Sequence, residues 1–204
     1  MSIVKLNNRG VRSATAFGSI TGLGSMVFIK KQTASSSGSL TFVDGTSDVV
    51  LDDTYKEYLF TFKHIHPATD DQPLVFQANA AGGSGYNETM TTTYFRAYNT
   101  EAASAGFGYD SNRDLGESTS FQQVISDIGN GNDENGSGYL HLFNPSSTTF
   151  VKHFTCWTSS LSSGGAVVQF IGGYFNTTSA VNAISFKMGA GNIDSGTIKM
   201  YGYT

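Results

Sequence analysis

The sequence contains one cysteine and three prolines, and charged residues make up only 14% of its 204 residues. The lone Cys156 excludes a disulfide framework within the chain and any CxxC metal site. No hydrophobic run approaches the roughly 18 residues of a membrane span, and residues 1–24 lack the apolar segment of a secretory signal. We therefore expect a protein that is made soluble, is not secreted on its own and has no membrane partner.

Helical periodicity is missing as well, whereas short alternating runs rich in aromatic and β-branched residues recur along the chain. Such runs predict strands at 25–33, 39–43, 55–65, 74–79, 91–98, 166–175, 183–188 and 197–203. Residues 120–128 are compatible with a strand or a short helix, and we favour the strand. The 24 glycines and many Ser, Thr and Asn residues suit the turns between them, with loops at 80–86 and 128–138. About ten strands at roughly ten-residue spacing predict an all-β fold, an antiparallel β-sandwich or jelly roll.

Residues 138–157 are predicted to form the central hairpin, because two strand-like runs flank the turn-forming residues 144–147. If Phe143 lies opposite Phe150, one face carries Tyr139, His141, Phe143, Phe150, Lys152, Phe154 and Cys156. The other face then carries Leu140, Leu142, Val151, His153, Thr155 and Trp157. Neither face is polar throughout, so we expect the hairpin to lie mid-sheet, with one side in the core and the other partly covered.

Charge is distributed unevenly between the start of the chain and the rest. Residues 1–31 hold five of the 12 basic residues and none of the 16 acidic ones. This predicts an extended basic N-terminal arm, residues 1–24, ahead of a sandwich domain at 25–204. The residues that would dock the arm on an acidic partner are Lys5, Arg9, Arg12, Lys30 and Lys31; a solvated terminus is the alternative. We expect no nucleic-acid partner, because the charges are sparse and the body is acidic.

Two groups of residues could bind a metal. His64 and His66 lie two apart at a strand end, where both rings could reach one transition-metal ion. The oxygen-rich loop around Asp127 and Asp133 could hold calcium, although it does not fit the EF-hand spacing. Polar strand-end histidines and a solvated turn are the alternatives. We expect no metal and no cofactor.

Residue patterns of known catalytic sites are also missing. No G-x-S-x-G elbow occurs, and the run Gly82-Gly83-Ser84-Gly85 lacks the lysine and helix of a phosphate-binding loop. Cys156 precedes Trp157 in an apolar run, which favours a buried structural thiol over a nucleophile. The sequence therefore predicts a protein that is not an enzyme.

Five segments resemble a family of virion structural proteins of tailed bacteriophages that is common in marine and cyanobacterial phages. They are LDDTYK (51–56), HPATD (66–70), NAAGGSGY (79–86), LFNPSSTT (142–149) and GNIDSGTI (191–198). The resemblance covers roughly residues 38–202. It implies a β-sandwich located in the virion after synthesis in the host cytoplasm, similar to a tail-fibre or capsid-decoration protein, and it supplies no catalytic residues.

Two functions are compatible with these observations. The first is a structural accessory protein, a capsid decoration or a head or tail appendage, docked on other virion proteins by its arm. The second is a tail-fibre-type receptor-binding module that recognises a host surface glycan through loop residues. The best candidates for glycan contacts are Tyr86, Asn87, Phe107, Tyr109, Asp110 and Arg113. By analogy with phage surface proteins we expect a homo-oligomer and predict a trimer.

Overall fold

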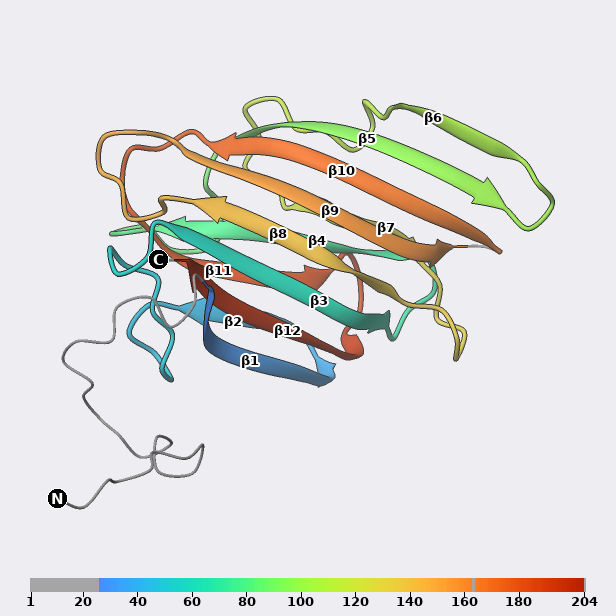
Figure 1. Ribbon diagram of the computed structural model, residues 1–204, viewed down its shortest axis with the longest axis horizontal. Coiled ribbons are helices and arrows are strands. Elements are labelled where there is room, and N and C mark those ends of the chain that lie inside the picture. Colours follow the sequence, from blue (N-terminus) through green and yellow to red (C-terminus); the bar gives the residue numbers. More distant parts are fainter. Residues whose placement is uncertain (1–25, 163, 204) are drawn as a thin grey trace, which may run out of the picture.

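The computed structural model describes residues 26–162 and 164–203, and none of these residues forms a helix (Figure 1). Strands account for the regular structure: β1 (Met26–Ser37), β2 (Leu40–Val43), β3 (Glu57–Pro67), β4 (Gln72–Ala80), β5 (Met90–Thr100), β6 (Ala105–Tyr109), β7 (Gln122–Ile128), β8 (Gly136–Phe143), β9 (Lys152–Ser162), β10 (Gly165–Phe175), β11 (Val181–Met188) and β12 (Ile193–Tyr203). Within the described part of the chain, no helix could span a membrane.

The strands form two antiparallel sheets packed face to face. The large sheet has the order β1-β12-β3-β8-β9-β10-β5-β6, and the small sheet has the order β2-β11-β4-β7. Figure 1 looks onto the large sheet, with the small sheet behind it. From β2 onward the chain alternates between the sheets as in a jelly roll, but the hairpin β5-β6 and the meander β8-β9-β10 each take the place of a single strand. The predicted all-β, antiparallel sandwich is confirmed.

The described part of the chain includes only two of the five predicted docking residues. Residues 1–24, with Lys5, Arg9 and Arg12, lie outside the described residues. Lys30 and Lys31 lie in β1 and pair with Met200 and Lys199 of β12. These two lysines therefore belong to the edge of the sandwich.

Phenylalanine rings from both sheets meet in the middle of the core. Phe186 of β11 is fully buried, and its ring centroid lies 5.3 Å from that of Phe62 and 5.5 Å from that of Phe60, both on β3. Its neighbours within the small sheet are Phe42, at 6.3 Å, and Phe76, at 6.1 Å. Edge-to-face and stacked pairs of this kind stabilise a core beyond the area that they bury.

The central hairpin lies mid-sheet as predicted, but its predicted register is wrong. Tyr139 pairs with Trp157 and Leu142 with Phe154, so residues 144–151 form the connection between β8 and β9. The predicted and observed pairings differ by an odd number of residues, so the side chains of one strand lie on the opposite face from the one predicted. The inner face carries Leu140, Leu142, Lys152, Phe154 and Cys156, all buried. The outer face carries Tyr139, His141, Phe143, His153, Thr155 and Trp157.

Contacts with distant loops explain the longer connection. The Asn144 amide donates to the carbonyl oxygen of Lys56, and the Val181 amide donates to that of Pro145. A local turn pattern cannot reveal either contact. As a consequence His141 and His153, predicted to lie on opposite faces, share the outer one.

Burial of weak acids predicts that the fold loses stability in alkaline solution. Burial raises the pKa of Tyr94 to about 12, and it raises the pKa values of Tyr58 and Cys156 as well. The unfolded chain releases these protons near its ordinary values of 9.0 for the thiol and 10.0 for the phenols. The stability that these three groups contribute is therefore fully present below the pKa values of the unfolded chain, and it is lost as pH rises toward 12.

Lys152 has the opposite effect on stability, because burial lowers its pKa and a rise in pH therefore favours its folded, neutral form. We expect the combined effect of Tyr58, Tyr94 and Cys156 to exceed that of this single lysine. We expect the urea midpoint to fall steadily above pH 9 and to fall less in Tyr58→Phe. A midpoint that stays constant or rises over this range would contradict the prediction.

Candidate ligand-binding face

One row of residues in hydrogen-bonded register crosses the whole outer face of the large sheet. From β6 to β8 the row consists of the aromatic residues Tyr109, Phe95, Phe170, Trp157 and Tyr139. We call these five residues the aromatic row. The register continues through Thr61 of β3 to Lys199 of β12 and Lys31 of β1. Each of the eight strands of the large sheet therefore contributes one residue to a single line.

The side chains of the aromatic row are exposed and contact one another. Trp157 is 48% exposed, and each of the other four is between 38% and 49% exposed. Ring centroids lie 4.9 Å apart for Trp157 and Phe170, 6.4 Å apart for Trp157 and Tyr139, and 5.2 Å apart for Phe95 and Tyr109. Each ring of the row is therefore partly buried and partly open to solvent among the described residues.

Two hollows border the aromatic row. A hollow of about 350 Å³ is lined by four of its rings together with Gly172, Thr93 and Thr155. A second, of about 220 Å³, lies beside Tyr139 and Trp157 and is lined by Ser137, Gly138 and Ser159. Gly172 leaves open space on the outer face, because a Cβ there would meet only Thr93 Oγ1, at 3.7 Å. The rings therefore border space in which a flat ligand could lie.

Two of the side chains beneath the aromatic row are polar, although their neighbours Leu140, Cys156 and Ile171 belong to the apolar core. Gln169 and Thr158 point inward and are buried, whereas their neighbours Phe170 and Trp157 are exposed. Thr158 Oγ1 donates to Gln169 Oε1 at 2.8 Å, and Gln169 Nε2 donates to Ser126 Oγ at 3.0 Å. Folding alone favours aromatic rings inside and amides outside. The exposed rings are therefore better explained by binding than by packing.

Three lysines occupy the other half of the same face. Lys31 and Lys199 are paired neighbours, and Lys63 lies on β3 two residues beyond Thr61. None of the three forms an ion pair with another described residue. We call them the lysine group; it lies in the half of the face away from Tyr109, which also carries Glu57, Tyr201 and Tyr203.

The predicted glycan contacts are spread over three places. Phe107 and Tyr109 were expected in a loop, but they lie on the edge strand β6, where Tyr109 belongs to the aromatic row and its hydroxyl donates to Asp114. Tyr86 and Asn87 lie in the loop between β4 and β5. Burial raises the pKa of the Tyr86 hydroxyl, which lies beside Thr41 of the small sheet. The structure therefore does not bring these two residues to the outer face of the large sheet.

Asp110 and Arg113 are engaged in a four-membered charge cluster. Arg113 Nε lies 3.0 Å from Asp110 Oδ2, and Arg113 Nη2 lies 2.6 Å from Asp127 Oδ2. Arg96 Nε lies 3.1 Å from the same Asp110 oxygen. Asp127, a predicted calcium ligand, therefore contacts arginines. This cluster joins β5, the loop after β6, and β7, and its groups pair with one another.

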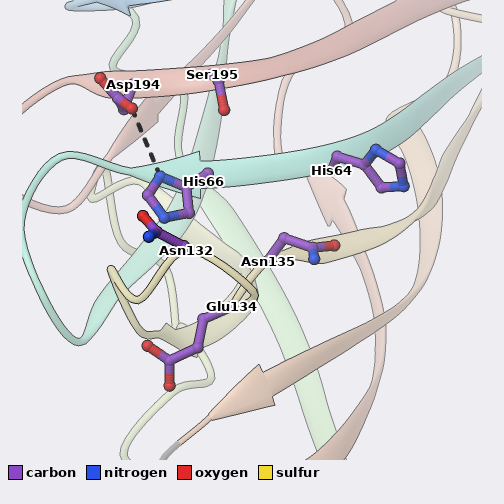
Figure 2. A pocket seen from close by; sticks show the side chains of 7 residues that line it. All are labelled: His64, His66, Asn132, Glu134, Asn135, Asp194 and Ser195. Atoms are coloured by element: carbon purple, nitrogen blue, oxygen red, sulfur yellow. Dashed lines mark ion pairs between the residues drawn. The ribbon is translucent and has the colours of Figure 1, made fainter.

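The predicted histidine site lines a hollow of about 340 Å³ between the loop 129–135 and the start of β12 (Figure 2). His66 Nδ1 lies 3.7 Å from Asp194 Oδ2, and its Nε2 lies 3.1 Å from the Gly131 carbonyl oxygen. The ring of His64 points away from that of His66 in Figure 2. The reason is that β3 has a bulge here and that His64 has a φ of 51°, which interrupts the alternation of side chains along the strand. Among the described residues no three His, Cys, Asp or Glu side chains converge as metal ligands.

Sequence reasoning missed Phe95, Phe170, Trp157 and Tyr139 as a joint surface. Each lies in a predicted strand whose side chains alternate between the two faces, so the sequence alone was compatible with an exposed position for each of them. Only the order of the strands and their registers bring the four together. The lone tryptophan beside a polar Thr158 was the one local signal.

Comparisons of the chain with protein-family models, with curated proteins and with solved structures find no match.

Proposed function

We propose that this chain is a non-enzymatic structural protein of a tailed-phage virion. Support comes from the way in which four of the five phage-like segments come together in two pairs. Each spans a connection between strands: the segment 51–56 contacts 142–149, where Ser146 Oγ donates to Asp53 Oδ1 at 3.1 Å. The segment 66–70 contacts 191–198, where the Ala68 amide donates to the Asn192 carbonyl at 3.0 Å. The resemblance therefore rests on segments that are also neighbours in space.

A structural role is favoured by the state of the reactive side chains. Cys156 is buried, and burial raises the pKa of its thiol, which disfavours the nucleophilic thiolate. The acidic pair Asp110 and Asp127 is held by Arg96 and Arg113. The single observation that carries the proposal is the pairwise contact between phage-like segments that are far apart in the sequence.

The basic start of the chain would attach the sandwich to the particle. A segment that orders on binding loses conformational entropy, but a homo-oligomer presents several copies and so raises the effective concentration of each. The trimer and the neighbouring capsid or tail protein are parts of this proposal.

Deletion of residues 1–24 tests the attachment. We expect purified particles to lose the protein, while circular dichroism of the truncated chain keeps its β-sheet spectrum. A matched variant, Lys5→Gln/Arg9→Gln/Arg12→Gln, removes charge without shortening the chain and should also reduce incorporation. Normal incorporation of the truncated protein would contradict docking by the arm.

A second function, recognition of a host surface glycan, is favoured by the aromatic row specifically. Exposed aromatic rings in line offer flat apolar surface, which the C–H faces of sugar rings can cover. The direct test is adsorption of phage to host cells in the presence of the purified full-length protein. Inhibition that is lost in Trp157→Ala supports this function, and absence of inhibition argues against it.

A further inference from the structure

We propose that the outer face of the large sheet binds a polysaccharide in which acidic sugars are interspersed with neutral ones. The polymer would lie across the strands, over the aromatic row and the lysine group. This inference rests on the glycan-recognition function proposed above and specifies its ligand class and its site.

The aromatic half of the face matches a polymer of flat rings. The row offers one ring per strand over five neighbouring strands, and strands lie about 4.8 Å apart. That spacing is comparable to the length of one sugar unit. Each sugar could therefore cover one aromatic ring, and the hollow at Gly172 gives a substituent room beside the row. Many weak contacts along one polymer combine into useful avidity.

The lysine group supplies the charge complementarity. Lys199 and Lys31 continue the line of the aromatic row, with only Thr61 between them and Tyr139. Their ammonium groups have no acidic partner among the described residues, so carboxylate, sulfate or phosphate groups of a bound polymer could pair with them. A ligand that covers both halves must have apolar ring faces as well as negative charges.

The width of the row favours a linear polymer over a second protein surface. Small residues flank it along β10, with Gly172 on one side and Val168 on the other, and along β9, with Thr155 and Ser159. Phe107, which stacks on Phe95 with ring centroids 6.5 Å apart, widens the row at β6. A stable protein interface buries about 800 Å² per partner, which is still broader than this row. A single-stranded nucleic acid carries a phosphate on every unit, whereas the lysine group pairs with charges at one end of the line only, so phosphates over the aromatic row would lack a cation.

Calorimetric titration of the full-length protein tests the proposal. The probes are octasaccharides of hyaluronan, chondroitin and gellan, each with its carboxyl-reduced, neutral form. We expect at least one acidic probe to bind more tightly than its reduced form. Trp157→Ala should weaken binding of both forms about tenfold, whereas Lys31→Gln/Lys199→Gln should weaken only the acidic form, to the level of the reduced one.

Two control variants match these changes elsewhere on the molecule. Phe150→Ala removes a 69% exposed ring from the connection between β8 and β9. Lys187→Gln removes a lysine from the small sheet, where its ammonium lies 4.2 Å from the Phe121 ring centroid. Both variants should bind like the unmodified protein; a loss of affinity as large as that of Trp157→Ala would overturn the assignment of the site.

Other outcomes separate this inference from the function on which it rests. If no acidic probe binds while the protein still inhibits phage adsorption, the ligand class is wrong and glycan recognition stands. Equal affinity for acidic and reduced probes overturns the role of the lysine group. Equally tight binding of oligothymidylate, or a dimer in sedimentation that Trp157→Ala abolishes, would assign the face to nucleic acid or to a second copy and overturn the proposal.

Discussion

Replacing Phe186 by alanine is expected to lower the free energy of unfolding by about 3–5 kcal/mol, a large share of the stability of a typical domain. The ring is fully buried and lies between Phe60 and Phe62 of the large sheet and Phe42 and Phe76 of the small one. Its removal leaves a cavity that four large neighbours border and cannot fill without leaving their own contacts. Urea denaturation followed by circular dichroism measures the loss.

Phe150→Ala is the matched control, because it removes the same ring from an exposed position. We expect its unfolding free energy to stay within about 0.5 kcal/mol of the unmodified protein. Equal losses in the two variants would mean that the core does not lie where the two sheets meet.

Replacing Gly138 by alanine is expected to destabilise the protein by about 3 kcal/mol. Gly138 lies in the middle of β8 at a φ of 153°, a conformation that side chains rarely adopt. A Cβ at this position would lie 2.6 Å from the Cα of Thr158 and would overlap the carbonyl oxygen of Trp157. The clash is with the backbone of β9, so no rotamer change relieves it, and the two central strands must separate.

Gly172→Ala provides the control for this prediction. Gly172 lies on the outer face of β10, where an added methyl group meets nothing closer than 3.7 Å. Its stability should be unchanged or slightly higher, because alanine reduces the conformational entropy of the unfolded chain. A Gly138→Ala protein that unfolds at the same urea concentration as Gly172→Ala would show that β8 and β9 are not packed as described.

Much of the fold follows from the alternation of residue types. Tyr58, Phe60 and Phe62 alternate with Leu59 and Thr61, and all three aromatic rings are buried on one side of β3 as that pattern predicts. The strand β6 was missed, because Gly106 and Gly108 interrupt its five residues and weaken the strand pattern. Its pairing with β5 compensates for that weak local preference.

The candidate site could not be predicted in the same way. Local residue types placed possible glycan contacts in loops, where Asp110 and Arg113 instead pair with each other. The aromatic row depends on strand registers set by contacts far apart in sequence, such as Phe170 with both Phe95 and Trp157. An error of one position in any strand would have moved its ring to the inner face.

Fluorescence of the sole tryptophan tests most directly whether the outer face is the functional surface. Trp157 lies in the aromatic row and is half-exposed, so its emission reports on that face alone. Titration with the acidic octasaccharide that binds most tightly in calorimetry should shift its emission to shorter wavelength and saturate at the same stoichiometry, because a sugar ring that covers the indole excludes water. Saturable binding in calorimetry that leaves the emission of Trp157 unchanged would contradict the account.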